Sequence, residues 1–489
     1  MKRSSLAIVI TAAALLVAVF AGAGGVPGLS RIHFLADLAD LAGSSGGSGA
    51  GGSGTGGPDL IARMYSSADP YSPAYNHPYR YGVVPTLTQL GKMQTWALAH
   101  PQAGNPAPNS EDVSYRGGIG GIGVTDGPEQ VYLVFWGQQW GTAGSTGGYT
   151  TLSGDPKGAV PYLQKLFKGL GTGSEKWSGV MTQYCEGVAT GTFTCPSANL
   201  EHVGYPFGGA LAGVWADESA SAPAAATPAQ LGAEAIDAAA HFGNTTAASN
   251  RLTQYVILSP AGTDPDHYKE DGFCAWHDWS GDSYVGASSP YGPISFTNMP
   301  YVTDVGASCG ENFVNLGTAG ILDGFSIVAG HEYAETITDQ DPAGGYTNSV
   351  GSEVADLCTW NEGPGARAAN LSLSTGRFAM QSIWGNDGAG GGDCEFSHTI
   401  ISNNTVTFAG DQRTAKGTAV SLQIEATDSQ VGQNFTWSAT GLPAGLSINS
   451  STGLISGTPT TLQTVLVTVT AKDKTGAHGS VTFTWTVHS

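Results

Sequence analysis

The sequence predicts a multidomain protein: an α/β or α+β main domain over residues 59–400 and an all-β sandwich over residues 401–489. A chain of 489 residues is long enough for two or three domains with cores of their own. All six cysteines precede residue 401, and beyond it Thr, Val and Ser dominate short alternating segments. This change in composition predicts the boundary between the two domains.

The first residues resemble an export signal. Lys2 and Arg3 precede an uncharged apolar run, Leu6 to Phe20, and small residues end at Ala23. This pattern is typical of a secretory signal peptide, residues 1–23, cleaved after Ala23. Residues 24–58, rich in Gly and Ser, then form a linker or a propeptide remnant. We therefore expect a secreted protein with no membrane span in its mature form.

The even number of cysteines agrees with export, because exported chains keep disulfides rather than thiols. Six cysteines allow 15 pairings, which the sequence does not distinguish. The simplest expectation joins nearest neighbours: Cys185 with Cys195, Cys274 with Cys309, and Cys358 with Cys394. There is no CxxC pair, which argues against a thiolate zinc site. The net charge of −20, without a basic surplus, excludes nucleic acid as a partner.

Elements of the main domain follow from periodicity. Continuous apolar runs at 130–136 and 255–258 predict buried strands. Helical spacing of apolar residues predicts helices over 161–170 and 228–242. Strands interspersed with helices indicate the α/β or α+β class.

Strict alternation marks the C-terminal region. Residues 465–470 and 481–487 alternate apolar and polar side chains, which predicts strands, and their spacing indicates a β-sandwich. The stretches GLPAGLSI at 441–448 and STGLISGTP at 451–459 place glycines at turn positions that need positive φ. This pair of stretches resembles the immunoglobulin-like domain of bacterial surface proteins, which is related to cadherin-like folds.

That resemblance implies a spacer or adhesive module, and with it a cell-wall or surface polymer as a partner. Calcium binding is sometimes inferred for this family. Calcium is therefore possible here, but the module's four acidic residues are too scattered to form a calcium site.

The segment FSIVAGHEYAETITD at 325–339 contains the candidate metal-binding and catalytic residues. Its apolar spacing suits a partly buried helix, on which His331 and Glu335 face the same way and Glu332 lies one step round. Imidazole and carboxylate are zinc ligands, and an adjacent glutamate can act as a general base. The alternative is a solvated helix face whose charges do no chemistry.

The HExxE pattern resembles the HExxH helix of zincin metallopeptidases, with glutamate in place of the second histidine. The resemblance implies that His331 and Glu335 bind zinc and that Glu332 is the catalytic base. It also implies a third ligand on the next helix, for which Glu353 fits, with Asp356 as the residue that orients His331. His277 is the alternative third ligand.

A wider resemblance covers much of residues 125–396. The FWG at 135–137, the GFCAWH at 272–277, the His331 helix, the Glu353 to Cys358 turn and the stretch from Ser382 to Cys394 are similar to the secreted phosphate-induced (Exordium-like) proteins. This family's biochemical activity is not well defined, so the likeness implies secretion rather than a reaction.

Two functions remain open from the sequence. The first is a secreted zinc-dependent peptidase, which hydrolyses peptide bonds of extracellular proteins with metal-activated water. The second is a non-catalytic extracellular or cell-surface protein with a structural metal site and an adhesive module.

Overall fold

The computed structural model describes residues 64–100, 112–127, 129–196, 200–388, 392–401, 404–407, 409–428, 434–473 and 478–489. The predicted signal peptide and the linker at 24–58 lie outside the described residues. In the part of the chain that is described, no helix is both long and apolar enough to cross a bilayer.

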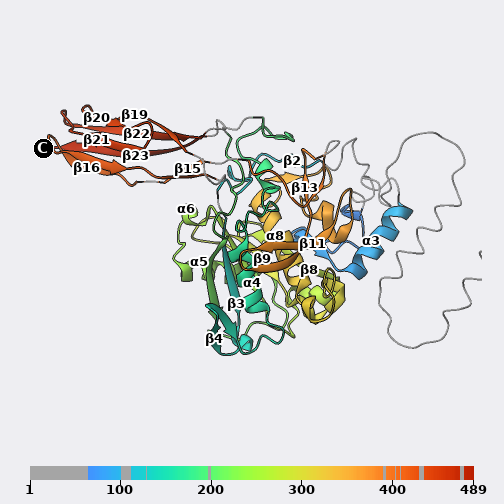
Figure 1. Cartoon of the computed structure of the whole chain (residues 1–489). Helices are drawn as coiled ribbons and strands as arrows, with labels where there is room; N and C mark the ends of the chain where they lie inside the picture. Colours follow the sequence, from blue (N-terminus) through green and yellow to red (C-terminus); the bar gives the residue numbers. More distant parts are fainter. Residues whose placement is uncertain are drawn as a thin grey trace, which may run out of the picture. The chain divides into compact units, whose positions relative to one another are not determined.

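The main domain is built on a mixed six-stranded sheet (Figure 1). Strands β6, β3, β7 and β9 run parallel, while β8 and β1 extend the sheet in antiparallel fashion. In sheet order the strands are β1 (Tyr81–Pro85), β8 (Phe273–Trp279), β9 (Ser295–Met299), β7 (Thr253–Leu258), β3 (Gln130–Trp136) and β6 (Leu211–Asp217).

Helices cover both faces of this sheet. In β3, Leu133 and Phe135 enter one core with helices α4 and α8, whereas Val134 enters a second core with α5. Successive side chains of a strand point to opposite faces, so a strand buried on both sides must be apolar throughout. The helices are α3 (Leu87–Ala99), α4 (Ala159–Gly169), α5 (Pro228–Phe242), α6 (Ala247–Asn250), α7 (Tyr268–Asp271) and α8 (Asp323–Thr338).

The long elements predicted from periodicity are confirmed: β3 and α5 have the predicted bounds, and β7 and α4 contain or overlap the predicted segments. Short hairpins and two-strand ladders surround them: β2 (Ser114–Tyr115) with β10 (Tyr346–Thr347), β4 (Ala143–Thr146) with β5 (Tyr149–Leu152), β11 (Ala368–Leu373) with β12 (Gly376–Gln381), and β13 (Ile383–Gly385) with β14 (Asp393–Glu395). The 3₁₀ turns are η3 (Gln138–Trp140), η4 (Met181–Gln183), η5 (Pro265–His267), η6 (Val302–Asp304), η7 (Gly306–Cys309), η8 (Gly317–Ala319) and η9 (Asp356–Asn361).

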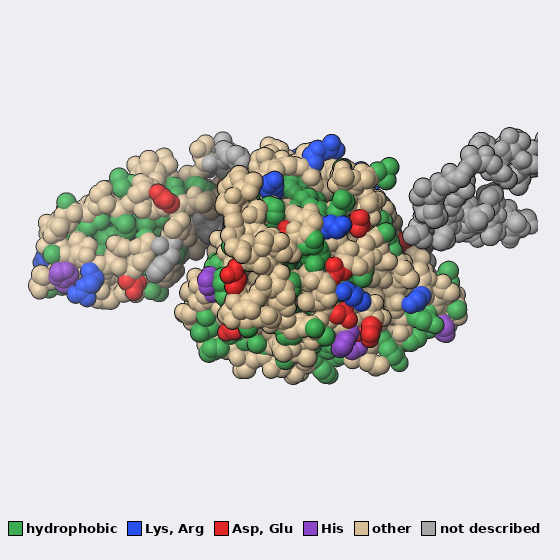
Figure 2. All heavy atoms as spheres, turned by 90° about the horizontal axis from the view of Figure 1, so that it is seen from below, with side chains coloured by type: hydrophobic (Ala, Val, Ile, Leu, Met, Phe, Trp, Pro, Cys, Tyr) green, Lys and Arg blue, Asp and Glu red, His purple; other side chains and the backbone are tan. Residues whose placement is uncertain are grey.

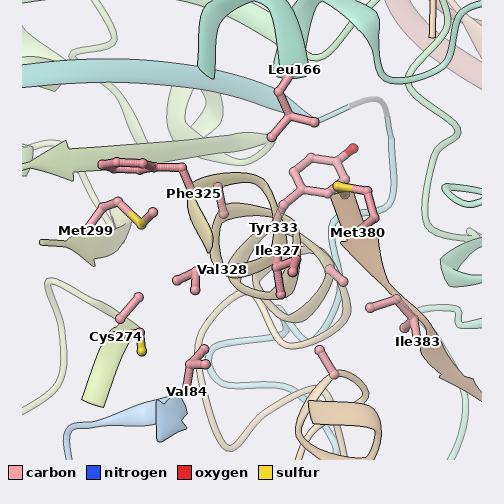
Figure 3. Close-up of a cluster of buried hydrophobic side chains, with 14 of the residues drawn as sticks. Val84, Leu166, Cys274, Met299, Phe325, Ile327, Val328, Tyr333, Met380 and Ile383 are labelled. Atoms are coloured by element: carbon pink, nitrogen blue, oxygen red, sulfur yellow. The ribbon is translucent and has the colours of Figure 1, made fainter. Parts of the chain in front are cut away.

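Helix α8 runs through the interior of the main domain, and each of its residues is buried. Figure 3 shows apolar side chains from many elements around it, among them Val84, Leu166, Met299 and Met380. A helix buried on all sides cannot solvate polar side chains, so those it carries need partners within the protein.

The C-terminal region is a β-sandwich-like arrangement of short sheets. Four strands form one sheet, three form a second, and two pair separately. A core separate from those of the main domain, including Trp437, Val467 and Trp485, lies within it. In sheet order the strands are β16 (Gln412–Ala415), β23 (His478–His488), β22 (Gln463–Lys472) and β19 (Thr436–Thr440); β17 (Val420–Gln423), β21 (Leu454–Gly457) and β20 (Leu446–Ile448); and β15 (Asn404–Val406) with β18 (Ala426–Asp428).

The glycines of the module's motif adopt the predicted conformation. Gly441, Gly445, Gly453 and Gly457 all have positive φ. At Gly445 a Cβ would also lie 2.1 Å from the carbonyl oxygen of Thr458. Only glycine fits such a position, because both the dihedral angle and the backbone contact exclude a side chain.

The nearest-neighbour disulfides are confirmed: Cys185–Cys195, Cys274–Cys309 and Cys358–Cys394. On the face shown in Figure 2, charged side chains lie scattered among uncharged ones, as a charged fraction of 12% predicts.

Candidate metal centre

Helix α8 carries three of the predicted site residues, one turn or less apart. His331 Nε2 lies 3.0 Å from Glu335 Oε2, as the four-residue spacing predicts. His331 and Glu335 are 0% exposed and Glu332 is 1% exposed. A solvated helix face is therefore excluded, since none of these groups reaches water.

Strand β8 brings His277 against the same helix. Its neighbour Trp276 enters the core beneath α5, so His277 points to the opposite face, where α8 lies. His277 Nδ1 lies 3.2 Å from Glu332 Oε2, and Nε2 lies 3.5 Å from Glu353 Oε1. His277 and Glu353, which the sequence presents as alternatives, therefore lie side by side.

The segment after β10 supplies the remaining two carboxylates. Asp356 opens η9, whereas Glu353 precedes that turn in irregular chain. The α-helix implied for these residues is thus replaced by irregular chain at Glu353 and a kinked six-residue 3₁₀ segment from Asp356. Asp356 Oδ1 lies 3.7 Å from His331 Nε2, while its Oδ2 accepts a hydrogen bond from the N–H of Glu353.

These side chains form two groups of three that share Glu335. One group is His277, Glu335 and Glu353, and the other is His331, Glu335 and Asp356. Within each group, one ligand atom per residue lies within 4.8 Å of the others. The zincin resemblance implies instead a set of His331, Glu335 and Glu353, which the structure divides between the groups.

Contacts behind the ligand atoms fix their orientation. Gln381 Oε1 lies 3.2 Å from His331 Nδ1, the position in which Asp356 was expected to orient the ring. Glu335 Oε1 accepts hydrogen bonds from the backbone N–H groups of Ala355 and Asp356. With its proton on Nδ1, His277 donates to Glu332, as metal-binding histidines commonly donate to a carboxylate. Gln381 belongs to no sequence motif. Only the packing of β12 against α8 identifies it as a residue of this site.

The atoms that face inward have no hydrogen-bond partner. These buried, unpartnered atoms are Nε2 of His277 and of His331, Oε1 of Glu332, Oε2 of Glu335, both carboxylate oxygens of Glu353 and Oδ1 of Asp356. Buried polar atoms are otherwise almost always paired, so this cluster calls for a ligand. Nitrogen and carboxylate oxygen together are the donor set of zinc and related divalent metals.

Gly82 of β1 closes the centre from the side of the sheet. Its φ is +53°, and a Cβ there would lie 1.9 Å from Glu335 Oε2 and 2.7 Å from His277 Nδ1. The backbone therefore approaches the ligand atoms more closely than any other residue type would allow. Sequence reasoning did not single out this glycine, because the strand pattern around it shows no motif.

Burial and mutual repulsion dominate the electrostatics. Burial, with the neighbouring Glu335 charge, raises the pKa of Glu353 well above its usual value and that of Asp356 to about 8. Burial opposes protonation of His331, but the Glu335 and Asp356 carboxylates together with the contact to Gln381 outweigh it and raise the His331 pKa to about 9. Protonation and a bound divalent ion would therefore each offset the same buried negative charge. The residues present fit a divalent metal.

Comparisons with known proteins bear on the C-terminal module. Residues 401–488 match the family described as "Putative Ig domain". A "Serine-rich adhesin for platelets" of Staphylococcus aureus is 37% identical over 83 residues, which are 17% of this chain and 6% of the adhesin. The matched stretch therefore spans a small part of that relative.

Solved structures similar to part of the chain include two surface proteins. The SrpA adhesin of Streptococcus sanguinis is 15% identical over 18% of this chain and 55% of that chain, with a TM-score of 0.14. Domains 4 and 5 of the S-layer protein SbsC are 15% identical over 30% of this chain and 64% of that chain, with a TM-score of 0.15. Scores of this size carry no argument, so the sandwich assignment depends on the strands and on the family match.

Proposed function

We propose that the protein is an extracellular surface protein whose main domain is stabilised by a buried divalent metal ion and whose C-terminal module serves attachment. The nitrogen and carboxylate ligands favour zinc as that ion. The observation that carries this proposal is burial. The six side chains around the centre are at most 4% exposed. A metal enclosed in this way stabilises a fold, because structural sites are closed whereas catalytic sites keep a position open to substrate.

The module supports the surface assignment. It matches an immunoglobulin-like family, and a relative of similar sequence is named as an adhesin. Three disulfides in the main domain agree with an oxidising environment, as does the predicted signal peptide. Cell-wall or surface polymers, or proteins of another surface, are the partners that such a module would contact.

Glu332 supports a second candidate, a zinc-dependent peptidase. Its Oε1 has no partner and lies beside the ligand atoms, where a general base would stand. Bound zinc would supply a Lewis acid that polarises a peptide carbonyl. Glu332 would accept a proton at Oε1, and one histidine of the centre together with Glu335 would hold the metal. This candidate requires β1 to move, because Gly82 lies over Glu335 and His277.

One set of measurements tests both candidates. The full chain, loaded with zinc and freed of excess, should contain bound zinc and should unfold at a lower temperature after chelation. Ligand at 100 times its Kd contributes about 2.7 kcal/mol to the stability of the folded state. The same preparation should leave a broad peptide library uncleaved.

Hydrolysis by the wild type that is lost in Glu332→Gln, with zinc retained, would instead establish the peptidase. A wild-type protein that binds no zinc would contradict both candidates.

A further inference from the structure

The two groups of ligand atoms differ in all residues except one. We infer that they form a two-cation centre, in which Glu335 bridges one divalent ion held by His277 and Glu353 and a second held by His331 and Asp356. This inference depends on the metal centre of the proposed function and goes beyond it in the number of ions and the assignment of each ligand.

The geometry separates the two ions. In the described part of the chain, no group of mutually close ligand atoms contains both histidines. Two nitrogens that bind one zinc ion, each about 2.1 Å away, lie at most about 4.2 Å apart. A single ion would therefore leave one histidine nitrogen buried without a partner. Two ions satisfy both.

Glu335 is placed to bridge. Its Oε1 already accepts two backbone N–H groups, so only Oε2 remains for a metal. Oε2 is buried and unpartnered, and it lies 3.0 Å from His331 Nε2. It also borders the imidazole of His277, 3.9 Å from the Nδ1 that faces Glu332. One oxygen that faces both groups suits a pair of ions about 3.5–4 Å apart, the usual spacing of two-metal sites.

The charge of the centre also matches two ions. Glu332, Glu335, Glu353 and Asp356 are four buried carboxylates, and their ion pairs in the described structure involve the two histidines and no Lys or Arg. One divalent cation with neutral histidines leaves a net charge of about −2 in the interior, whereas two give neutrality. Uncompensated buried charge is strongly unfavourable.

Metal stoichiometry of the full chain tests the inference. Loaded with zinc and then passed through gel filtration, the wild type should retain about two zinc ions per chain. Glu353→Gln and Asp356→Asn keep the side-chain volume and each remove one terminal ligand, so each should retain about one. Glu129→Gln, a buried carboxylate outside the centre, is the matched control and should retain about two.

Electron paramagnetic resonance of the manganese-loaded protein gives an independent measurement. The wild type should show an exchange-coupled pair, and Asp356→Asn a single uncoupled ion. One zinc per chain in the wild type, with an uncoupled manganese spectrum, overturns the two-cation centre but leaves the proposed metal site. No retained metal overturns both. Should the variants fail to fold, the wild-type stoichiometry and spectrum decide the question.

Discussion

Replacing Gly82 with alanine perturbs the centre without removing a ligand. The new Cβ would lie 1.9 Å from Glu335 Oε2, whereas non-bonded carbon and oxygen atoms normally lie about 3.4 Å apart. Glu335 or β1 must therefore move by about 1.5 Å, far beyond the tolerance of about 0.2 Å on a metal–ligand distance. Glu335 cannot yield freely, because two backbone N–H groups hold its other oxygen.

We expect Gly82→Ala to weaken zinc binding by about 10- to 100-fold. The left-handed alanine should separately lower the stability of the fold by about 1–2 kcal/mol. Competition with a chromophoric chelator measures the affinity, and circular dichroism reports folding. Gly91→Ala is the control: Gly91 lies in α3 with no heavy atom near its Cβ position, so this change should stabilise the helix and leave zinc affinity unchanged. A folded Gly82→Ala protein with wild-type affinity would show that Glu335 Oε2 is not a ligand.

Three further predictions concern stability. Burial raises the pKa of Glu129 from 4.5 to about 8, so unfolding releases its proton between these pH values and the free energy of unfolding falls as pH rises from about 4.5 to 8. Glu129→Gln should therefore raise the free energy of unfolding at pH 8.5 by up to about 5 kcal/mol and change it little at pH 4. Thermal melts at both pH values measure this, and a constant difference across pH would refute it. Gly445→Ala should destabilise the module and accelerate hydrogen exchange throughout β20 to β22, because its Cβ meets a backbone carbonyl. Gly417→Ala is also at positive φ but in open space, so it should lower the stability of the module by only about 1–2 kcal/mol and accelerate exchange less. Equal acceleration in both variants would contradict the steric argument. Replacing Cys274 and Cys309 by alanine opens a loop of sequence separation 35 and should lower the free energy of unfolding by about 4 kcal/mol. The same change at Cys185 and Cys195, whose separation is 10, should lower it by about 3 kcal/mol. Denaturant unfolding of the main domain, followed by tryptophan fluorescence, measures both.

Sequence periodicity predicted the elements whose burial follows a regular pattern: continuous in β3, on one face in α5 and alternating in β22. Strand β3 is apolar at every inner position because two layers of helices cover it, and the capping box at Thr227 and Gln230 begins α5 where the sequence predicts a helix. The segment around Glu353 did not follow prediction. Tertiary contacts, including the hydrogen bonds from the N–H groups of Ala355 and Asp356 to Glu335 Oε1, determine its irregular path, and periodicity carries no signal of such contacts.

The candidate site was predictable only where its residues share one helix. The spacing of His331 and Glu335 follows from the helical repeat, so their contact could be expected from the sequence. Gln381 and Gly82 enter the site from strands that lie 50 residues or more away along the chain, and nothing local marks them. The same holds for the division of the ligands between two groups, which depends on how β8 and η9 approach α8.

The burial of the centre explains why the HExxE pattern alone does not establish a peptidase. The helical repeat brings two ligands and an adjacent glutamate together whether or not a substrate can approach them. Access is decided elsewhere, here by the backbone of β1 at Gly82. Glu332 illustrates the difference, because one of its oxygens accepts the His277 hydrogen bond and the side chain is 1% exposed. A carboxylate in that arrangement serves first to orient His277, and its use as a base would require an opening of the sheet edge that exposes Oε1.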